Sequence, residues 1–494
     1  MTATAERRSP LNLAEEAKRV GAPVAVGLVG SVLVLIGALA PDSPAVHHPA
    51  RPWFFAVPWP HVSRSLSVLM SMAVFSAGIL LLVRGWLAIM RRTRRGVPDP
   101  PAPGVVVVVF VVWALPLLVA PPLVSRDLYS YAAQGEIASR GLDPYQYTPR
   151  DLGPGEFLQE VDPLWQASAS PYGPLFMLAT RAAVTVADHR VRTAIVFLKV
   201  LSFFGCLLMA FGLTRLARAN GYREADALAV ALLNPITLIH LVGGAHNEAL
   251  MVALLVLGLG LAAEARPLLG IACCIVAGAV KTPALAGAVF IMWHWIVQPV
   301  PAALRFRRVV SSSVVAAVSF TIAVLPTQTP WRWLSLASTP THVQSYLSPS
   351  TITGLGVDRL LSPLGVTGDN FLSAWQLLFV VAGLGISLLC LLRVRRLGVA
   401  RALGLSLLAV ALLSPVLFPF YLMWGLAPLA GAGLRRERMT LIALSVVLTP
   451  AMLPGGRAVL DAIVALGPLW LGGAIAVLLI LSIPTKVPRL STAT

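Results

Sequence analysis

The stretch GVVVVVFVVWALPLLVAPPLVSRDLYSYAAQG, residues 104–135, joins an apolar run to a polar segment that opens with Arg126 and Asp127. The apolar part has about 20 residues, the length that an α-helix needs to cross a hydrocarbon core of about 30 Å. Asp127 follows it at once, so its carboxylate is held at a membrane surface. A charge there is costly unless it is paired or takes part in chemistry, and function is therefore expected close to it.

The rest of the chain repeats this apolar pattern. Of its 494 residues, 57% are hydrophobic and 12% are charged, and the mean hydropathy is +0.81, which is outside the range of soluble globular proteins. We expect an all-α polytopic membrane protein with about 14 transmembrane helices. The clearest predicted spans are residues 21–40, 65–90, 104–124, 191–214, 225–241, 246–265, 309–326, 371–392 and 462–483.

Lysine and arginine gather between alternate spans, and this sets the predicted topology. Such clusters mark cytoplasmic segments, and with both termini on that side the formal excess of +17 falls there, next to anionic lipid. The prediction is a plasma-membrane protein with cytoplasmic tails at 1–20 and 484–494 and a transmembrane domain at 21–483. No soluble basic domain remains to bind a nucleic acid. The four cysteines lie in apolar spans and predict no disulfide.

The outer side of this topology carries two long loops, 125–190 and 327–370. Loops of this length in compact proteins tend to be functional. The first loop contains a predicted short helix at 127–140, which glycine and proline stop. It also contains an apolar helix at 174–187 that is too short to span, so we expect it to lie at the outer surface.

Residues 267–297 are too long for one span and are interrupted at Lys281-Thr282-Pro283. This pattern predicts a re-entrant-like helical hairpin with its tip toward the outer face. An ammonium at membrane depth is costly, usually faces a cavity and attracts an anion. Lys281 is therefore a candidate phosphate ligand; the alternatives are a salt bridge to a buried acid such as Glu248, or snorkelling toward headgroups.

Asp127 itself has two interpretations. It is either the N-cap of the helix that follows or a catalytic acid at the mouth of a cavity. Tyr129, Tyr131 and Gln134 lie on overlapping faces of that helix and offer hydroxyl and amide groups to a sugar or a phosphate. For the tyrosines, an interfacial aromatic belt is the alternative.

A second polar group, His246-Asn247-Glu248, opens a predicted span on the outer side. Such a triplet at a helix N-terminus binds an anion or a metal, or simply caps the helix. A metal would need further ligands, which only folding could supply, from Asp127 or His342.

Aromatic side chains cluster in SPVLFPFYLMW, residues 414–424, where two prolines interrupt a predicted span. Phe420, Tyr421 and Trp424 are suited to stack on a sugar or a prenyl chain, and plain packing is the alternative. The sequence has neither a G-x-x-x-x-G-K-[ST] loop nor a strand-associated G-x-G-x-x-G. Energy must then arrive with a lipid-borne substrate or an ion gradient.

Several of these features together resemble a known group of enzymes. An acid opening the first long outer loop, Tyr172-Gly173-Pro174-Leu175 before a surface helix, the Lys281-Thr-Pro hairpin and the proline–aromatic segment are similar to the GT-C superfamily of multispan glycosyltransferases. Within it, DLYSYAAQG, GLDPYQYTP and HNEALM resemble the actinobacterial polyprenol-phosphomannose-dependent α-(1→6)-mannosyltransferases of lipomannan and lipoarabinomannan core synthesis. The resemblance covers nearly the whole chain and implies the GT-C fold.

The resemblance also implies an activity on the outer, periplasmic face. Mannose would pass with inversion from polyprenyl-phosphate-mannose to the 6-hydroxyl of a lipid-anchored α-mannan acceptor, with Asp127 as the general base. Cations would hold the donor phosphate: Lys281 first, then Arg126 and Arg332. The predicted substrate-binding residues are Tyr129, Tyr131, Gln134, Tyr172, His246, Asn247, Glu248, His342, Tyr346, Tyr421 and Trp424.

No cofactor is expected from this resemblance. The nearest outer approach to a D-x-D motif is Glu160-Val-Asp162, so a divalent metal is not favoured. Two alternative functions remain. One is a transferase that uses an arabinose or glucose lipid, and the other, in a different class, is a transporter or flippase for a lipid-linked glycan. A transporter predicts an inverted repeat and charges along a midplane path, and the sequence shows neither.

Overall fold

The structure is a computed structural model that describes residues 12–45, 53–94, 96–325, 331–336, 345–365, 368 and 370–456. Their regular secondary structure is helical, with no β-strand, which confirms the predicted all-α class. The α-helices are α1 Asn12–Leu39, α2 Arg64–Thr93, α3 Pro103–Val119, α4 Asp127–Ser139, α5 Glu156–Gln159, α6 Pro174–Val186, α7 Val191–Ala219, α8 Glu224–Ala231, α9 Glu248–Ala263, α10 Pro267–Gly278, α11 Leu285–Ile296, α12 Ala302–Val324, α13 Arg332–Leu336, α14 Pro349–Leu361, α15 Phe371–Leu392, α16 Val394–Leu397, α17 Val399–Leu413, α18 Leu422–Gly431 and α19 Arg438–Leu448. A π-helix spans Thr237–Gly243, and 3-10 helices span Pro149–Leu152, Thr282–Ala284, Ser362–Leu364, Pro419–Tyr421 and Thr449–Ala451.

Five helices in the described ranges are long and apolar enough to cross a membrane, as expected of a membrane protein. They are α1 from Val20 onward, α2, α7, α12 and α15, and a sixth span is counted if the π-helix and α9 are taken together. Other apolar helices, such as α3 and α17, have 10–17 residues. The count of about 14 spans stays a prediction, and the predicted span 462–483 lies outside the described residues.

The segment predicted as one span at 225–241 is not a continuous helix, because the chain breaks within it. α8 ends at Ala231 and the π-helix begins only at Thr237. Pro235 has no N–H group to continue the first helix. At the break, the Asn234 side chain bonds backbone groups on both sides: Nδ2 donates to the Val230 carbonyl (3.1 Å), and Oδ1 accepts from the Ile236 N–H (2.9 Å). After the π-helix the chain bends by 115° into α9.

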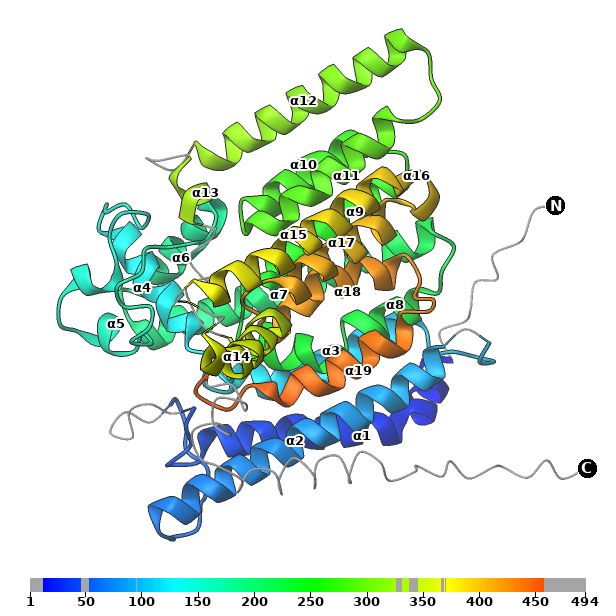
Figure 1. The fold of residues 1–494 in the computed structure, drawn as a ribbon. Coiled ribbons are helices and arrows are strands. Elements are labelled where there is room, and N and C mark those ends of the chain that lie inside the picture. The colour runs from blue at the N-terminus through cyan, green and yellow to red at the C-terminus, as the bar shows by residue number, and fades with distance from the viewer. Residues whose placement is uncertain are drawn as a thin grey trace, which may run out of the picture.

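The short elements predicted beside the spans are present as helices. α4 and α6 match the predicted helices at 127–140 and 174–187. α10 and α11 pack against each other, and an extended Lys281 and the 3-10 helix Thr282–Ala284 connect them, so the predicted hairpin is confirmed as a pair of helices. Figure 1 shows α4, α5, α6 and α13 at one end of the bundle, opposite to α8 and α16. The membrane side that each end faces stays a prediction.

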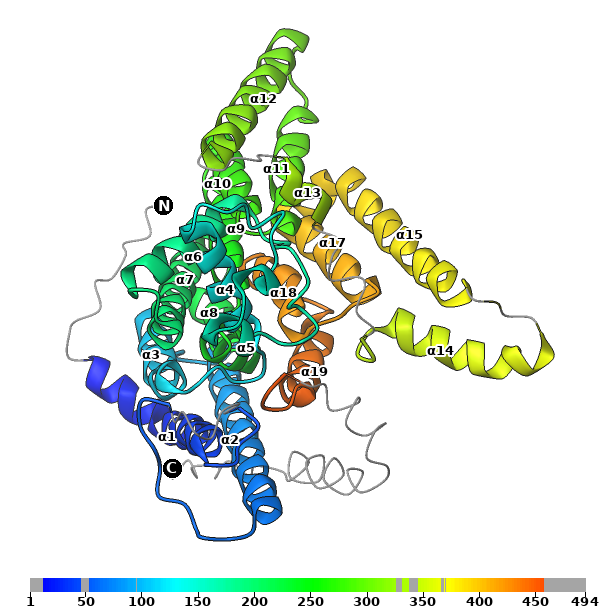
Figure 2. The same cartoon turned by 90° about the vertical axis from the view of Figure 1, so that its left-hand side faces the viewer.

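The buried centre of the bundle is formed by α18 and the π-helix, in which every residue is buried, together with α7 and α9. By contrast, only 11% of the most apolar windows of α12 and α15 is buried. Figure 2 shows both of these helices projecting from the rest of the molecule. Helices with such apolar, uncovered surfaces are suited to contact lipid chains.

Small residues allow α1 and α2 to pack in close contact. A Cβ atom added to Gly30 would lie 2.6 Å from the Leu82 backbone nitrogen, and one added to Gly78 would lie 2.6 Å from the Val34 nitrogen. No larger residue fits at either point without moving a backbone. Close approach at small residues is typical of helix pairs in membranes.

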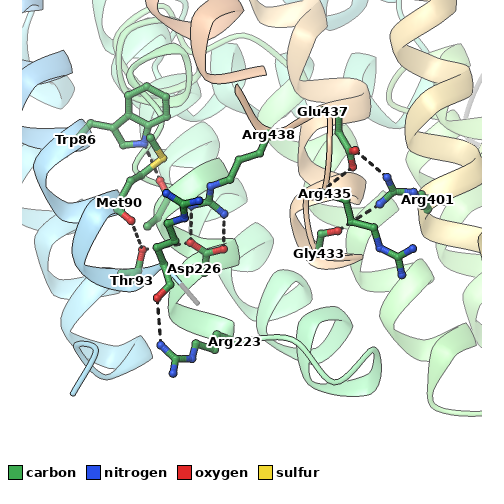
Figure 3. Close-up of polar contacts among 12 residues, drawn as sticks. Trp86, Met90, Thr93, Arg223, Asp226, Arg401, Gly433, Arg435, Glu437 and Arg438 are labelled. Atoms are coloured by element: carbon green, nitrogen blue, oxygen red, sulfur yellow. Dashed lines mark hydrogen bonds and ion pairs between the residues drawn. The ribbon is translucent and has the colours of Figure 1, made fainter. Parts of the chain in front are cut away.

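Ion pairs tie the helix ends together at the arginine-rich end of the molecule (Figure 3). Arg438 at the start of α19 forms a bidentate ion pair with Asp226 of α8, in which the guanidinium donates at 2.6 and 2.7 Å. Arg401 of α17 pairs with Glu437 (2.7 Å). Part of the basic charge predicted on this side is therefore neutralised by neighbouring acids.

Candidate active site

A cavity of about 230 Å³ lies where α4 approaches the tip of the α10–α11 hairpin. It is lined by Asp127, Ser130 and Gln134 of α4, by Trp165, Ser168, Ala169, Pro171 and Tyr172 before α6, by Lys281, Thr282 and Pro283 of the hairpin tip, and by Val410, Ser414, Val416, Phe418, Phe420, Tyr421 and Trp424. Segments separated by almost 300 residues in sequence thus meet at one cavity. Concave sites with a few polar groups on an apolar wall are the usual binding sites for small substrates.

The hairpin tip is docked onto the start of α6 by the backbone. The Gly173 N–H donates to the Val280 carbonyl and the Leu175 N–H to the Ala279 carbonyl, both at 3.0 Å. A Cβ atom at position 173 would lie 2.1 Å from the Ala279 oxygen, so only glycine permits this approach. This contact sets Tyr172 beside Lys281, with the ammonium 5.7 Å from the ring centroid.

Asp127 is the first residue of α4, and Arg126 occupies the N-cap position. No side-chain cap bond is formed there, so the interpretation of Asp127 as an N-cap is wrong. Its backbone N–H donates to Ser125 Oγ (3.0 Å), and its side chain is 24% exposed and lines the cavity. Burial raises the pKa of Asp127 to about 6, against the opposing effects of the Ser125 hydroxyl and the Lys281 charge. A carboxylate with this pKa is ionised at neutral pH and is basic enough to take a proton.

Lys199 of α7 holds the start of the segment that leads from α3 to Asp127. This fully buried ammonium donates to the carbonyls of Leu117 (3.0 Å) and Ala120 (2.6 Å) at the end of α3. The last carbonyls of a helix lack partners within the helix and attract cations. Lys199 therefore anchors the point from which the chain runs to Asp127.

His246 lies behind Asp127 and is fully buried. Its Nδ1 atom is 3.4 Å from Asp127 Oδ2, and its ring stacks on Phe420 with a centroid distance of 3.7 Å. His246, Asn247 and Glu248 do not line the cavity. Their placement supports the residues that do line it, rather than direct contact with a substrate.

Lys281 faces the cavity from the hairpin tip and forms an ion pair with the buried Glu248. The salt bridge considered from the sequence is thus present. The Lys281 side chain is nevertheless 13% exposed, and its ammonium lies 5.0 Å from the ring centroid of Tyr421 and 5.7 Å from that of Trp424. Aromatic faces at this distance stabilise a cation that is partly removed from water.

Three further polar atoms on the cavity wall are buried without a hydrogen-bond partner among the described residues. They are Ser130 Oγ and Gln134 Oε1 on α4, and Trp424 Nε1 on α18. Asp127, Ser130 and Gln134 follow one another at helical spacing, so they share one face of α4. Unpaired buried polar atoms cost free energy, and a ligand with hydroxyl groups would satisfy them.

Two family models match the chain. The first, described as alpha-(1->6)-mannopyranosyltransferase, N-terminal domain, covers residues 24–297, and the second, described as MptB C-terminal domain, covers residues 350–482. The alpha-(1->6)-mannopyranosyltransferase A of Mycobacterium tuberculosis is 30% identical over 439 residues, which are 86% of this chain and 82% of that protein. The chain belongs to the alpha-(1->6)-mannopyranosyltransferase family.

Relatives from a second genus agree with this placement. The alpha-(1->6)-mannopyranosyltransferase A of Corynebacterium glutamicum is 36% identical over 228 residues, covering 45% of this chain and 46% of that protein. The alpha-(1->6)-mannopyranosyltransferase B of the same organism is 26% identical over 483 residues, covering 88% and 77%. No solved structure matches the chain, so the GT-C fold as such stays a prediction.

Other residues predicted for the site of this mannopyranosyltransferase family member lie away from the cavity. Tyr131 packs its ring against Tyr172 with a centroid distance of 5.0 Å and does not line the cavity, and Tyr129 is buried on α4. Arg126 donates to the Glu160 carbonyl (2.7 and 3.1 Å) and to the Gln159 carbonyl (3.4 Å).

Of the candidates from the second loop, Arg332 is exposed on α13, and Tyr346 is partly buried and does not line the cavity. His342 lies outside the described residues. Among the residues that are described, no group of three or more His, Cys, Asp or Glu side chains is placed to hold a metal ion.

Sequence reasoning missed part of the cavity wall. Trp165 and Ser168 come from an irregular loop with no periodic pattern, so nothing in the sequence marks the direction of their side chains. Ser130 had a usable signal, because it lies three residues after Asp127 and therefore on the same helical face. Phe418 belongs to the aromatic segment already singled out.

Proposed function

We propose that this chain transfers mannose from polyprenyl-phosphate-mannose to the 6-hydroxyl of a lipid-anchored α-mannan, on the outer face of the membrane. One observation carries the proposal: the ionisable carboxylate of Asp127 and the ammonium of Lys281 line the same cavity. A sugar phosphate donor needs these two groups on opposite sides of the reacting carbon. Membership of the mannopyranosyltransferase family supports mannose as the sugar.

The proposed step is a single displacement at the anomeric carbon. The acceptor O6 attacks C1 of β-mannosyl phosphate while Asp127 takes the proton of that hydroxyl. The bond between C1 and the phosphate oxygen breaks, and its electron pair leaves with the phosphate, so no acid is needed for the leaving group. Attack from the opposite face gives the α-linked product. A positioned base of this kind contributes about 10² to 10⁴ in rate.

Lys281 is the proposed ligand of the donor phosphate. In the structure it is held against Glu248, and the neighbouring rings keep its ammonium at the cavity wall. An incoming phosphate brings negative charge that grows in the transition state, and a fixed cation at that point stabilises it. Arg126 and Arg332 stay predictions as phosphate ligands. The cavity lining favours Lys281 over both.

His246 is the proposed positioning residue for Asp127. A neutral imidazole that donates from Nδ1 to Oδ2 would leave Oδ1 free to face the acceptor hydroxyl. The stacking of the ring on Phe420 restricts its orientation. This arrangement has the logic of a base that is oriented by a third group.

Sugar hydroxyls are the proposed partners of the unpaired atoms on the wall, Ser130 Oγ, Gln134 Oε1 and Trp424 Nε1. Tyr172 and Tyr421 line the same cavity and offer ring faces for the sugar or the first prenyl unit. Buried polar groups that are satisfied only by the right hydroxyl pattern discriminate strongly between sugars.

The outer location of this reaction is supported by the distance between the cavity and the arginine-rich end. α9 begins at Glu248, beside the cavity, and its 16 residues end at Ala263, about 24 Å away at 1.5 Å per residue. Arg266 and the pair Arg215–Glu264 lie at that far end. If the basic end is cytoplasmic, the cavity lies near the opposite surface.

The test is an assay of the purified full chain with a synthetic α-mannoside acceptor and three donors in parallel: polyprenyl-phosphate mannose, arabinose and glucose. We expect product with the mannose donor, and a new α-(1→6) linkage by NMR. Product with only the arabinose or glucose lipid would overturn the donor assignment. Movement of the lipid across vesicles without any transfer would instead indicate a transporter.

A further inference from the structure

A second cavity, of about 410 Å³, lies at the arginine-rich end of the bundle. The ends of α7 and α9, the beginning of α10, the end of α11 and the beginning of α17 surround it. Its polar lining residues are Asn220, His294, Trp295 and Gln298, and the others are apolar, alanine or glycine. It is separated from the Asp127 cavity by the length of α9, so the proposed transfer reaction makes no use of it.

Several arginines at this end are paired with acids, among them Arg215 with Glu264 beside the cavity. Arg401 and Arg438 are neutralised by Glu437 and Asp226 (Figure 3). Arg266, between the lining residues Ala265 and Pro267, has no ion pair among the described residues, and neither has Arg395 on α16. α16, which carries Arg395, packs against α11, which carries the lining residue His294. The cavity is therefore bordered by two arginines that form no ion pair with a carboxylate in the part of the chain that the structure describes.

His294 presents a hydrogen-bond donor without an acceptor. The Gln298 amide nitrogen donates to the His294 carbonyl (3.2 Å) and also approaches His294 Nε2 (3.0 Å). Because that amide nitrogen is a donor, Nε2 is the acceptor and the ring proton lies on Nδ1. Nδ1 is buried and has no partner among the residues that the structure describes. An anionic oxygen is the natural partner for such a donor.

Two helices, α10 and α17, begin at this cavity. The first-turn N–H groups of a helix have no carbonyl partner within it and add to the positive character of the site. On the adjacent surface, Leu269 and Trp293 are 52% and 37% exposed. A basic pocket at the helix ends suits the headgroup of a phospholipid, and the adjacent apolar side chains suit its acyl chains.

We propose that this cavity binds the phosphate headgroup of an anionic phospholipid, with Arg266, Arg395 and His294 as the groups that recognise it. The acyl chains lie along the exposed faces of α10 and α11. The site also has a route to the Asp127 cavity, because α17 lines the second cavity at Val399 and the Asp127 cavity at Val410. A bound headgroup would hold the ends of α9, α11 and α17 in one arrangement.

The experiment compares the full chain in nanodiscs of phosphatidylcholine alone with nanodiscs that also contain cardiolipin. Native mass spectrometry after release of the protein reports which lipids stay bound, and thermal unfolding reports their effect on stability. We expect selective retention of cardiolipin and a higher unfolding midpoint in its presence. For Arg266→Gln/Arg395→Gln we expect a loss of about fivefold in apparent affinity per arginine, or about 25-fold for the pair.

Two variants serve as comparisons. Arg305→Gln/Arg307→Gln removes the same charge from the exposed start of α12, outside the cavity, and should retain cardiolipin. Ala263→Trp fills the cavity from an exposed lining position without changing a charge, and should lose it. An equal loss in the α12 variant, or no preference for cardiolipin in the wild type, overturns the site. Stabilisation by inorganic phosphate alone, at the level that cardiolipin gives, overturns a lipid as the source of the phosphate.

Discussion

Replacing Lys281 by methionine separates the ion pair that the structure shows for this side chain from the phosphate-binding role that we propose for it. Lys281 is the ion-pair partner of Glu248, which is fully buried, and it also lines the Asp127 cavity. The second carboxylate oxygen of Glu248 has no hydrogen-bond partner among the described residues, so Lys281→Met leaves that carboxylate with none. Removing one member of a buried ion pair costs about 3–5 kcal/mol. We expect a clearly lower thermal unfolding midpoint for the purified variant.

The double variant Lys281→Met/Glu248→Gln removes the orphaned charge as well, and should regain most of the lost stability. Transfer should stay lost in both variants, by about 10² to 10³ in kcat, because no cation then faces the leaving phosphate. Initial rates with the mannose donor, measured on the same preparations as the unfolding curves, separate the two effects. A double variant that regains activity together with stability would refute the phosphate role and leave Lys281 as a charge partner of Glu248 only.

Three further variants and conditions test the surroundings of the base. The proposed base Asp127 must be ionised to act, and burial raises its pKa to about 6, so kcat should fall as the pH drops through about 6. Glu248→Gln removes a neighbouring negative charge and should shift the acidic limb of the kcat–pH profile to lower pH. His246→Leu should lower kcat by about 100-fold with little change in KM, since misplacement of a catalytic group has that order of effect. His246→Gln keeps a hydrogen-bond donor and should retain more activity. Equal losses of activity in the two variants would contradict the positioning role of His246. Lys199→Met should cost about 1–3 kcal/mol by leaving two buried carbonyls unpaired, visible in the unfolding midpoint, while unchanged stability would show that water replaces the ammonium.

Local signals were sufficient to predict the elements around the site. The helix that starts at Asp127 was predicted because glycine and proline follow it, and the structure ends α4 at Ser139. The hairpin was predicted from the length of residues 267–297 and the interruption at Lys281, and both are features of the sequence alone. Asp127 and Lys281 stood out for one physical reason: each is a charge next to long apolar segments.

Other features depend on contacts between distant segments, which one sequence does not reveal. The break after α8 follows from Asn234 and Pro235, but hydropathy runs through it without a change. His246 was expected to contact substrate, yet it packs against Phe420, some 170 residues later, and lies beside Asp127 outside the cavity lining. Arg126 stays a prediction as a phosphate ligand, and the sequence alone did not reveal that its guanidinium donates to the backbone carbonyls of Gln159 and Glu160.

The most direct measurement is the transfer activity of Asp127→Asn with polyprenyl-phosphate-mannose and an α-mannoside acceptor. Asp188→Asn is the matched control, because Asp188 follows α6 in the same loop region and its side chain is 83% exposed. We expect a loss of about 10² to 10⁴ in kcat for Asp127→Asn, with unchanged unfolding and full activity in the control. Near-normal activity of correctly folded Asp127→Asn would contradict the assignment of the base and of the cavity.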